Sequence, residues 1–113
     1  MPIITVWCLP RKKQKKFRKL CRKIMKAVET VSELELKEKD ITVLFPKDYM
    51  RQGLGEEIII DVSGLFEKPE RTPEVCQKLA EKIGQTVAEM FPKSKVECFI
   101  RTFNPSNGFW TSE

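Results

Sequence analysis

Apolar and polar residues alternate in blocks that predict a β-α-β unit in the first half of the chain. Residues 3–9 form a short run of β-branched and aromatic residues ended by Pro10, which predicts a strand. A helix is predicted next, because apolar residues recur at its spacing at Phe17, Leu20, Cys21, Ile24, Met25 and Val28. Residues 40–45, closed by Pro46, predict a second strand.

The second half repeats this order. Residues 57–63 surround three consecutive isoleucines and predict a third strand. Thr72, Pro73 and Glu74 supply a capping hydroxyl, a proline for the first helical position and a first-turn acid, so they predict a helix that Pro92 ends. Residues 95–103 predict a fourth strand before turn-forming residues at 104–108. We expect one domain, 1–113, with repeat units at about 2–48 and 56–105.

This order predicts an α/β (α+β) fold in which two helices cover one face of a four-stranded mixed sheet. The first and third strands, however, have apolar residues at both odd and even positions, as in Ile3, Ile4, Val6 and Trp7. A strand with one solvated face would alternate apolar with polar residues. Since 113 residues leave no further chain to cover the second face, we expect a partner subunit to cover it. The alternative is that a few isoleucines are ordinary exposed surface residues.

Charge is concentrated in one segment. The chain has 21 basic and 16 acidic residues, and residues 11–26 hold ten of the bases and no acid. The remainder therefore carries an excess of five acids. A basic outward helix face is typical of a solvated surface, and it also suits a small anion, nucleic acid or an acidic protein surface.

Several classes of site are excluded by composition. The cysteines, at 8, 21, 76 and 98, are widely spaced and no histidine is present, so we predict reduced core thiols, no metal and no cofactor. No glycine-rich phosphate loop and no Ser-His-Asp set occur. No apolar run approaches the ~20 residues that span a bilayer, and apolar residues precede the basic ones at the start, so we expect a cytoplasmic protein without membrane contact.

Pro2 is the candidate for proton-transfer chemistry. Without histidine, acid–base work near neutral pH requires a group with a shifted pKa. Removal of Met1 would leave the secondary amine of Pro2 at the start of a strand, and burial with nearby cations lowers the pKa of such an amine. The alternatives are that Pro2 is a structural proline at a strand start and that Arg11 and Lys12 are solvated loop charges.

Three features together resemble the tautomerase superfamily, which contains 4-oxalocrotonate tautomerase and macrophage migration inhibitory factor. They are Pro2 opening the first strand, the two β-α-β units and the aromatic tail Gly108-Phe109-Trp110. The resemblance covers the whole chain in the superfamily's fused-repeat form. It implies a homotrimer whose sheets face inward as a barrel. It also implies that Pro2 is the general base for keto–enol proton transfer on a small anionic substrate, a 2-keto or enol acid.

The resemblance also implies substrate-binding residues. Short tautomerases have an arginine ten residues after the catalytic proline, where this chain has Lys12, so we expect Arg11 to share that role. Cytokine-like members direct a Tyr and an Asn of the last strand to the neighbouring subunit's proline. The matching positions look like Glu97 and Phe99, with Arg101 on the same face.

These positions depart from the family pattern, and their roles stay open. Glu97 could pair with Arg101, act as a second acid–base group or repel an acidic substrate. Phe99 has the alternative of simple packing, as is common for aromatic residues. A second arginine of the short tautomerases falls near Thr42, which carries no charge.

Nucleic-acid binding and a non-catalytic trimer are the alternatives. RNA-recognition domains share the β-α-β-β-α-β order and stack bases on exposed sheet aromatics. The third strand, residues 57–63, lacks their glycine–aromatic motif, and the basic residues belong to a helix behind the sheet. A basic helix that contacts the phosphate backbone needs no motif, so nucleic acid stays open as a less favoured partner.

Overall fold

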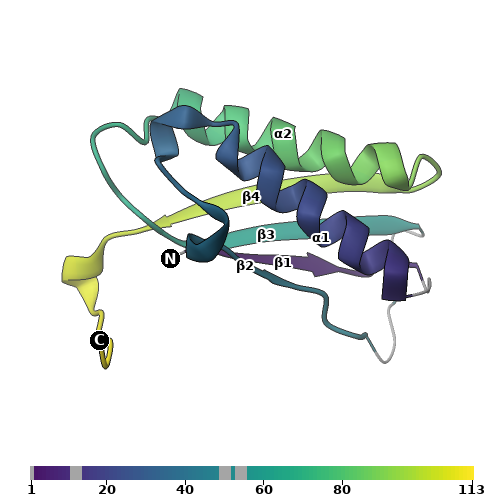
Figure 1. Ribbon diagram of the computed structural model, residues 1–113, viewed down its shortest axis with the longest axis horizontal. Helices are drawn as coiled ribbons and strands as arrows, with labels where there is room; N and C mark the ends of the chain where they lie inside the picture. Colours follow the sequence, from purple (N-terminus) through teal and green to yellow (C-terminus); the bar gives the residue numbers. More distant parts are fainter. Residues whose placement is uncertain (1, 11–13, 49–51, 53–55) are drawn as a thin grey trace.

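Four strands form one mixed sheet in the computed structural model, which describes residues 2–10, 14–48, 52 and 56–113. The strands are β1 (Ile3–Trp7), β2 (Thr42–Leu44), β3 (Glu57–Phe66) and β4 (Lys95–Phe103), in the spatial order β2-β1-β3-β4. Two helices, α1 (Gln14–Glu29) and α2 (Pro73–Met90), lie side by side on one face of the sheet (Figure 1). The fold predicted from the sequence is confirmed.

The sheet has an internal pseudo-twofold arrangement. β1 and β3 are antiparallel at the centre, and each has a parallel outer partner, β2 for β1 and β4 for β3. The N–H of Thr42 donates to the carbonyl of Pro2 over 3.1 Å, and the N–H of Lys95 donates to the carbonyl of Glu56 over 2.9 Å. Pro2 and Glu56 therefore hold equivalent positions, each immediately before a central strand.

The core lies between the helices and the sheet. Its fully buried side chains alternate along the central strands and recur every three or four residues on both helices, as the sequence pattern predicts. They include Ile4, Val6, Ile58 and Ile60 from the sheet, Leu20, Ile24 and Val28 from α1, and Leu79, Ile83 and Val87 from α2. Burying such a side chain contributes about 1.5–3 kcal/mol, so this layer stabilises the fold.

The opposite face of the sheet is apolar and exposed in the single chain. Ile3 and Trp7 of β1 are 38% and 42% exposed, Leu44 of β2 is 48% exposed and Phe99 of β4 is 52% exposed. No described helix or loop covers these side chains, because α1 and α2 both lie on the other face. Because the central strands carry apolar side chains on both of their faces, the sheet has a second apolar face that no described element covers.

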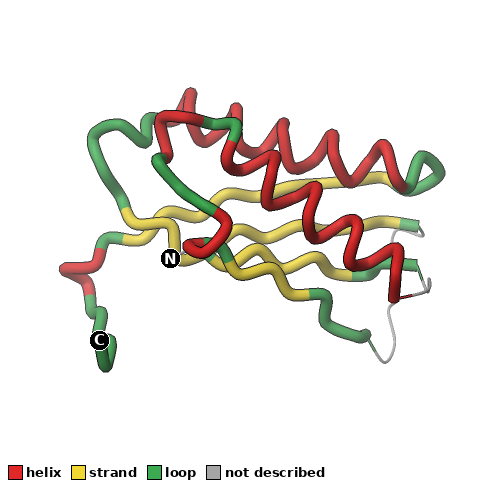
Figure 2. The backbone as a smooth tube through the Cα atoms, viewed as in Figure 1, coloured by secondary structure: helices red, strands yellow, loops and turns green. Residues whose placement is uncertain are grey.

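Local backbone geometry moves several predicted boundaries. β1 ends at Trp7 rather than at residue 9, because Cys8 adopts a left-handed conformation with φ 68°. β3 continues beyond residue 63 to Phe66 through an irregularity in its pairing with β4, where Gly64 has φ 70°. Short 3₁₀ turns at 32–34 and 38–40, drawn in red between α1 and β2 in Figure 2, shorten β2 to Thr42–Leu44.

None of the four cysteines forms a disulfide, and all four are partly buried. Burial, with a smaller contribution from the carboxylate of Asp61, raises the pKa of the Cys98 thiol from 9.0 to about 12. Within the described ranges, no group of three or more acidic, cysteine or histidine side chains is placed to hold a metal ion. Over the same ranges, no helix has both the length and the apolar character needed to cross a membrane.

Candidate active site

Pro2 lines a cavity of about 300 Å³ at the end of the sheet where β1 begins. The residue is buried, and its carbonyl is held by the start of β2. The loop after α1 and the segment joining β3 to α2 form the remaining walls. The other lining residues are Leu34, Glu35, Leu36, Asp40, Phe66, Lys68 and Arg71.

Arg71 provides the buried donor of this cavity. Its Nη1 donates to the carbonyl of Phe66 over 2.6 Å and its Nη2 donates to the carbonyl of Leu34 over 3.2 Å, so it joins the end of β3 to the loop after α1. Its Nε is buried and has no hydrogen-bond partner among the described residues. A buried donor without an acceptor costs about 1–3 kcal/mol, so the site suits a ligand oxygen that accepts this hydrogen bond.

Charges of both signs accompany Arg71 in the cavity. Lys68 adds a second cation, and the backbone N–H of Arg71 donates to the carbonyl of Lys68 over 2.9 Å, which fixes the turn between them. Asp40 accepts a hydrogen bond from the backbone N–H of Lys37 over 3.0 Å, and Glu35, at a left-handed position with φ 53°, also lines the cavity. The cavity thus offers two cations for an anionic ligand and two carboxylates that could exchange protons with it.

The aromatic tail contacts one wall of the cavity. Phe66 packs against Phe103 of β4 with ring centroids 6.1 Å apart, and Phe109 meets Phe66 edge to face at 4.9 Å. Trp110, one residue further on, is 83% exposed. Both ends of the chain therefore lie at the same end of the sheet (Figure 1).

Two predicted substrate-binding residues, Arg11 and Lys12, lie outside the described residues. Pro10, which precedes them, lines a different cavity from the one that contains Pro2. β1 separates Pro2 from Pro10, so the two prolines lie at opposite ends of this strand.

The other three predicted residues, Glu97, Phe99 and Arg101, lie on the exposed face of the sheet and not in the Pro2 cavity of the same chain. Phe99 is half exposed. Arg101 binds Asp61 with two hydrogen bonds, Nε to Oδ1 at 3.1 Å and Nη2 to Oδ2, and this pairing raises the pKa of Arg101. Arg101 therefore pairs with Asp61 rather than with Glu97.

Glu97 takes part in a small carboxylate pair. A hydrogen bond between the side chains of Glu97 and Glu57 lowers the pKa of Glu97 and raises the pKa of Glu57. The ammonium of Lys95, 3.6 Å from Oε1 of Glu97, lowers the pKa of Glu97 further. The exposed face thus carries paired charges among its apolar side chains.

Arg71 and Lys68 belong to no motif that identified them in the sequence. One signal points to Arg71 nevertheless. Arg71 stands two residues before Pro73, the first residue of α2, as Lys12 stands two residues before Gln14, the first residue of α1. Because β1 and β3 are antiparallel, the segment before α2 returns to the end of the sheet where Pro2 lies.

Comparisons with known proteins concern the fold. No protein-family model and no curated protein matches the sequence. A fused 4-OT solved as an asymmetric trimer matches with a TM-score of 0.77 and 15% identity, over 97% of this chain and 92% of that chain. Pt0534 inactivated by 2-oxo-3-pentynoate matches with a TM-score of 0.74 and 15% identity, over 97% and 93%. The chain has the tautomerase fold.

A third solved structure extends the comparison. Macrophage migration inhibitory factor of Toxoplasma gondii matches with a TM-score of 0.73 and 12% identity, over 98% of this chain and 97% of that chain. The likeness therefore spans the full tautomerase architecture, including both β-α-β units. At these identities it concerns the backbone, and the chemistry must be argued from the side chains of this chain.

Proposed function

We propose that the protein is a tautomerase in which Pro2, after removal of Met1, is the general base for keto–enol proton transfer on a small 2-keto or enol acid. The observation that supports this most directly is that Pro2 and Arg71, whose buried Nε has no hydrogen-bond partner among the described residues, line one cavity. The Pro2 nitrogen can accept a proton, and the Arg71 guanidinium can bind the substrate's carboxylate.

The reaction needs only one proton-transferring group. The unprotonated Pro2 nitrogen removes a proton from the carbon next to the substrate's carbonyl, and the electron pair of that C–H bond forms the C=C bond while the carbonyl π electrons move to the oxygen. The protonated Pro2 then donates this proton to that oxygen, which gives the enol; in the reverse direction Pro2 takes the proton from the enol oxygen and returns it to carbon. Burial of Pro2 and the cations Lys68 and Arg71 disfavour the protonated amine, which keeps it available as a base.

A homotrimer belongs to the same proposal. It would cover the exposed sheet face that carries Ile3, Trp7 and Phe99, and it would bring residues of that face to a neighbouring subunit. Fused 4-OT structures are themselves trimers, which supports this assembly. In the trimer, Glu97, Phe99 and Arg101 of one subunit are proposed to reach the Pro2 cavity of the next, with Arg11 and Lys12 as further substrate-binding residues.

The test is chemical labelling of the untagged protein with 2-oxo-3-pentynoate at neutral pH, followed by intact and peptide mass spectrometry. We expect stoichiometric labelling at Pro2, with Met1 absent and with protection by an excess of a non-electrophilic 2-keto acid. The variant Arg71→Gln should label about tenfold more slowly, since it loses the charged hydrogen bond to the carboxylate.

Lys82→Gln on the exposed side of α2 is the matched control, because it removes one positive charge far from the cavity; it should label at the wild-type rate. Retention of Met1 in the purified natural protein would contradict the proposal. So would labelling of Pro2 no faster than that of surface lysines.

A second candidate function rests on α1. Six basic side chains of this helix are exposed, and none forms an ion pair with a carboxylate of the described residues: Lys15, Arg18, Lys19, Arg22, Lys23 and Lys26. Such a face suits the phosphate backbone of a nucleic acid. Fluorescence anisotropy with a duplex of arbitrary sequence decides this, because binding through phosphates must weaken steeply as salt concentration rises.

A further inference from the structure

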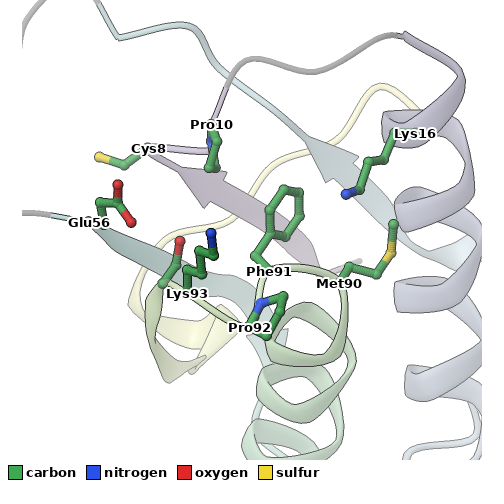
Figure 3. Close-up of a pocket in the computed structure, with 9 residues that line it drawn as sticks. Cys8, Pro10, Lys16, Glu56, Met90, Phe91, Pro92 and Lys93 are labelled. Atoms are coloured by element: carbon green, nitrogen blue, oxygen red, sulfur yellow. The ribbon is translucent and has the colours of Figure 1, made fainter.

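A second cavity, of about 410 Å³, lies at the opposite end of β1 from Pro2. Its walls come from the end of β1, the first turn of α1, the start of β3 and the turn between α2 and β4 (Figure 3). The lining residues are Cys8, Pro10, Lys16, Glu56, Met90, Phe91, Pro92, Lys93 and Ser94. A cavity of this size lies within the range that holds small ligands.

This cavity is the internal counterpart of the Pro2 cavity. Each contains the residue that precedes a central strand, Pro2 in one and Glu56 in the other, and both residues accept the same backbone hydrogen bond from an outer strand. The Pro2 cavity is lined by residues 34–40, which follow α1, and by residues 66–71, which lead into α2. The second cavity is lined by residues 90–94, at the end of α2 and after it, and by residues 8–10, which lead toward α1. The fold therefore forms two equivalent cavities, and the second cavity has Glu56 at the position that Pro2 holds in the first.

Two opposite charges border the second cavity without neutralising each other. Glu56 comes from the start of β3 and Lys93 from the turn after α2, and in Figure 3 both side chains extend beside the cavity below Pro10. Neither forms an ion pair with a described residue. A site with a separate anion and cation is complementary to a ligand that carries both charges a few bonds apart.

Pro10, Met90, Phe91 and Pro92 give the second cavity an apolar wall, beside the polar Cys8, Ser94 and Lys16. Phe91 is 5% exposed and belongs to the core, so its ring is a fixed surface, and Pro10, Met90 and Pro92 extend this surface. The ammonium of Lys16 lies 4.8 Å from the centroid of the Phe91 ring, which holds this lysine at the rim by a cation–π contact. An apolar ligand group therefore has a rigid wall to pack against, next to the charged end of the site.

We propose that the second cavity binds a small zwitterion, an α-amino acid with an apolar side chain. Its carboxylate pairs with Lys93, its ammonium pairs with Glu56, and its side chain packs against Phe91 and the prolines. Unlike Pro2, Glu56 cannot supply a free backbone amine, because its nitrogen is part of a peptide bond. The proposal goes beyond the tautomerase function and does not depend on Pro2 being a base.

Three ligands that differ by one charged group test the proposal by isothermal titration calorimetry. L-phenylalanine carries both charges, 3-phenylpropionate lacks the ammonium, and 2-phenylethylamine lacks the carboxylate. We expect L-phenylalanine to bind at least about tenfold more tightly than either analogue, since each analogue leaves one charged partner without its hydrogen bond. Equal affinities for the three ligands, or no binding of L-phenylalanine, would overturn the proposal.

Variants locate the site. Glu56→Gln and Lys93→Gln should each weaken the binding of L-phenylalanine about tenfold, and circular dichroism should remain unchanged because both side chains are exposed. Glu81→Gln and Lys82→Gln, which remove the same charges from the exposed side of α2, are the matched controls and should bind as the wild type does.

Arg71→Gln separates the two cavities. It should leave the binding of L-phenylalanine unchanged, because Arg71 lines the Pro2 cavity and does not line the second cavity. If Arg71→Gln abolishes binding while Lys93→Gln does not, the ligand occupies the Pro2 cavity and the proposal is wrong.

Discussion

Arg71 combines an observed structural role with the ligand-binding role that we propose for it. Its two terminal nitrogens bind the carbonyls of Phe66 and Leu34, and these bonds leave Nε as the buried donor that faces no described acceptor. A guanidinium can do this because its donors lie in a rigid planar fork. The position of Nε is therefore fixed by the fold before any ligand arrives.

Arg71→Lys should consequently affect stability and ligand binding together. A lysine has one nitrogen and cannot reach both carbonyls, so we expect the free energy of unfolding, measured by urea denaturation, to fall by about 1–3 kcal/mol. Labelling of Pro2 by 2-oxo-3-pentynoate should also slow. Wild-type stability in this variant would show that the two carbonyl contacts contribute nothing measurable.

Cys98 should react slowly with thiol reagents, and its raised pKa should make the free energy of unfolding fall at alkaline pH. Its thiol, with a pKa raised to about 12 mainly by burial, remains neutral in the folded protein, whereas it ionises near 9.0 when exposed by unfolding. We expect Cys98 to react with iodoacetamide more slowly than Cys76 at pH 8.5. The stabilising contribution is present below pH 9 and decreases as the pH rises from 9 toward 12.

Cys98→Ala provides the control for the pH effect. Urea denaturation between pH 8 and 11 should show a shallower loss of stability in this variant than in the wild type, because the thiol that loses its proton on unfolding is gone. Parallel pH profiles for the two proteins would assign the alkaline loss to other groups.

The sequence predicted Pro2 as the candidate base but not the cations that line its cavity, and the reason is physical. Pro2 can be singled out from the sequence because a proline has a free secondary amine only when it is the first residue of the chain, as Pro2 would be after removal of Met1. Arg71 and Lys68 become neighbours of Pro2 only because β3 runs antiparallel to β1, and this pairing joins residues about seventy positions apart. The roles predicted for Glu97, Phe99 and Arg101 depend on a second subunit and stay predictions.

At the scale of elements, the periodicity of apolar residues carried most of the information. Both helices and all four strands occur where the pattern predicts them, because burial against one core imposes the 3.6-residue and two-residue periods. The boundaries that differ depend on backbone conformation. The left-handed Cys8 and the short 3₁₀ turns before β2 follow from local geometry that hydrophobic periodicity does not encode.

Gly84 offers a stabilising substitution within α2. An added Cβ would lie 3.9 Å from the Cβ of Cys98 on β4, an ordinary van der Waals contact, so alanine fits. Because glycine in a helix interior costs about 0.5–1 kcal/mol relative to alanine, Gly84→Ala should raise the free energy of unfolding by roughly that amount. Urea denaturation measures it, and a loss of stability would show that the helix cannot accept the added methyl group here.

At the scale of the whole molecule, the exposed sheet face is the surface that we propose to form the trimer. Trp7→Glu places a charge on this face, so it should lower the mass in light scattering from that of the proposed trimer to that of a single 13.2 kDa chain. Gln85→Glu adds the same charge to the exposed side of α2 and should leave the trimer intact. A monomeric wild type, or a trimeric Trp7→Glu protein, would contradict this role of the face.

The equivalence of Pro2 and Glu56 has a consequence for how such a fold can diversify. Two β-α-β units joined in one polypeptide share a single amino terminus, so only one of the two equivalent cavities can contain a free backbone amine. Even a proline at position 56 would have its nitrogen locked in an amide. Fusion of the units therefore removes the free backbone amine from the second cavity, and under the proposed function the lining of that cavity can change without affecting the reaction at Pro2.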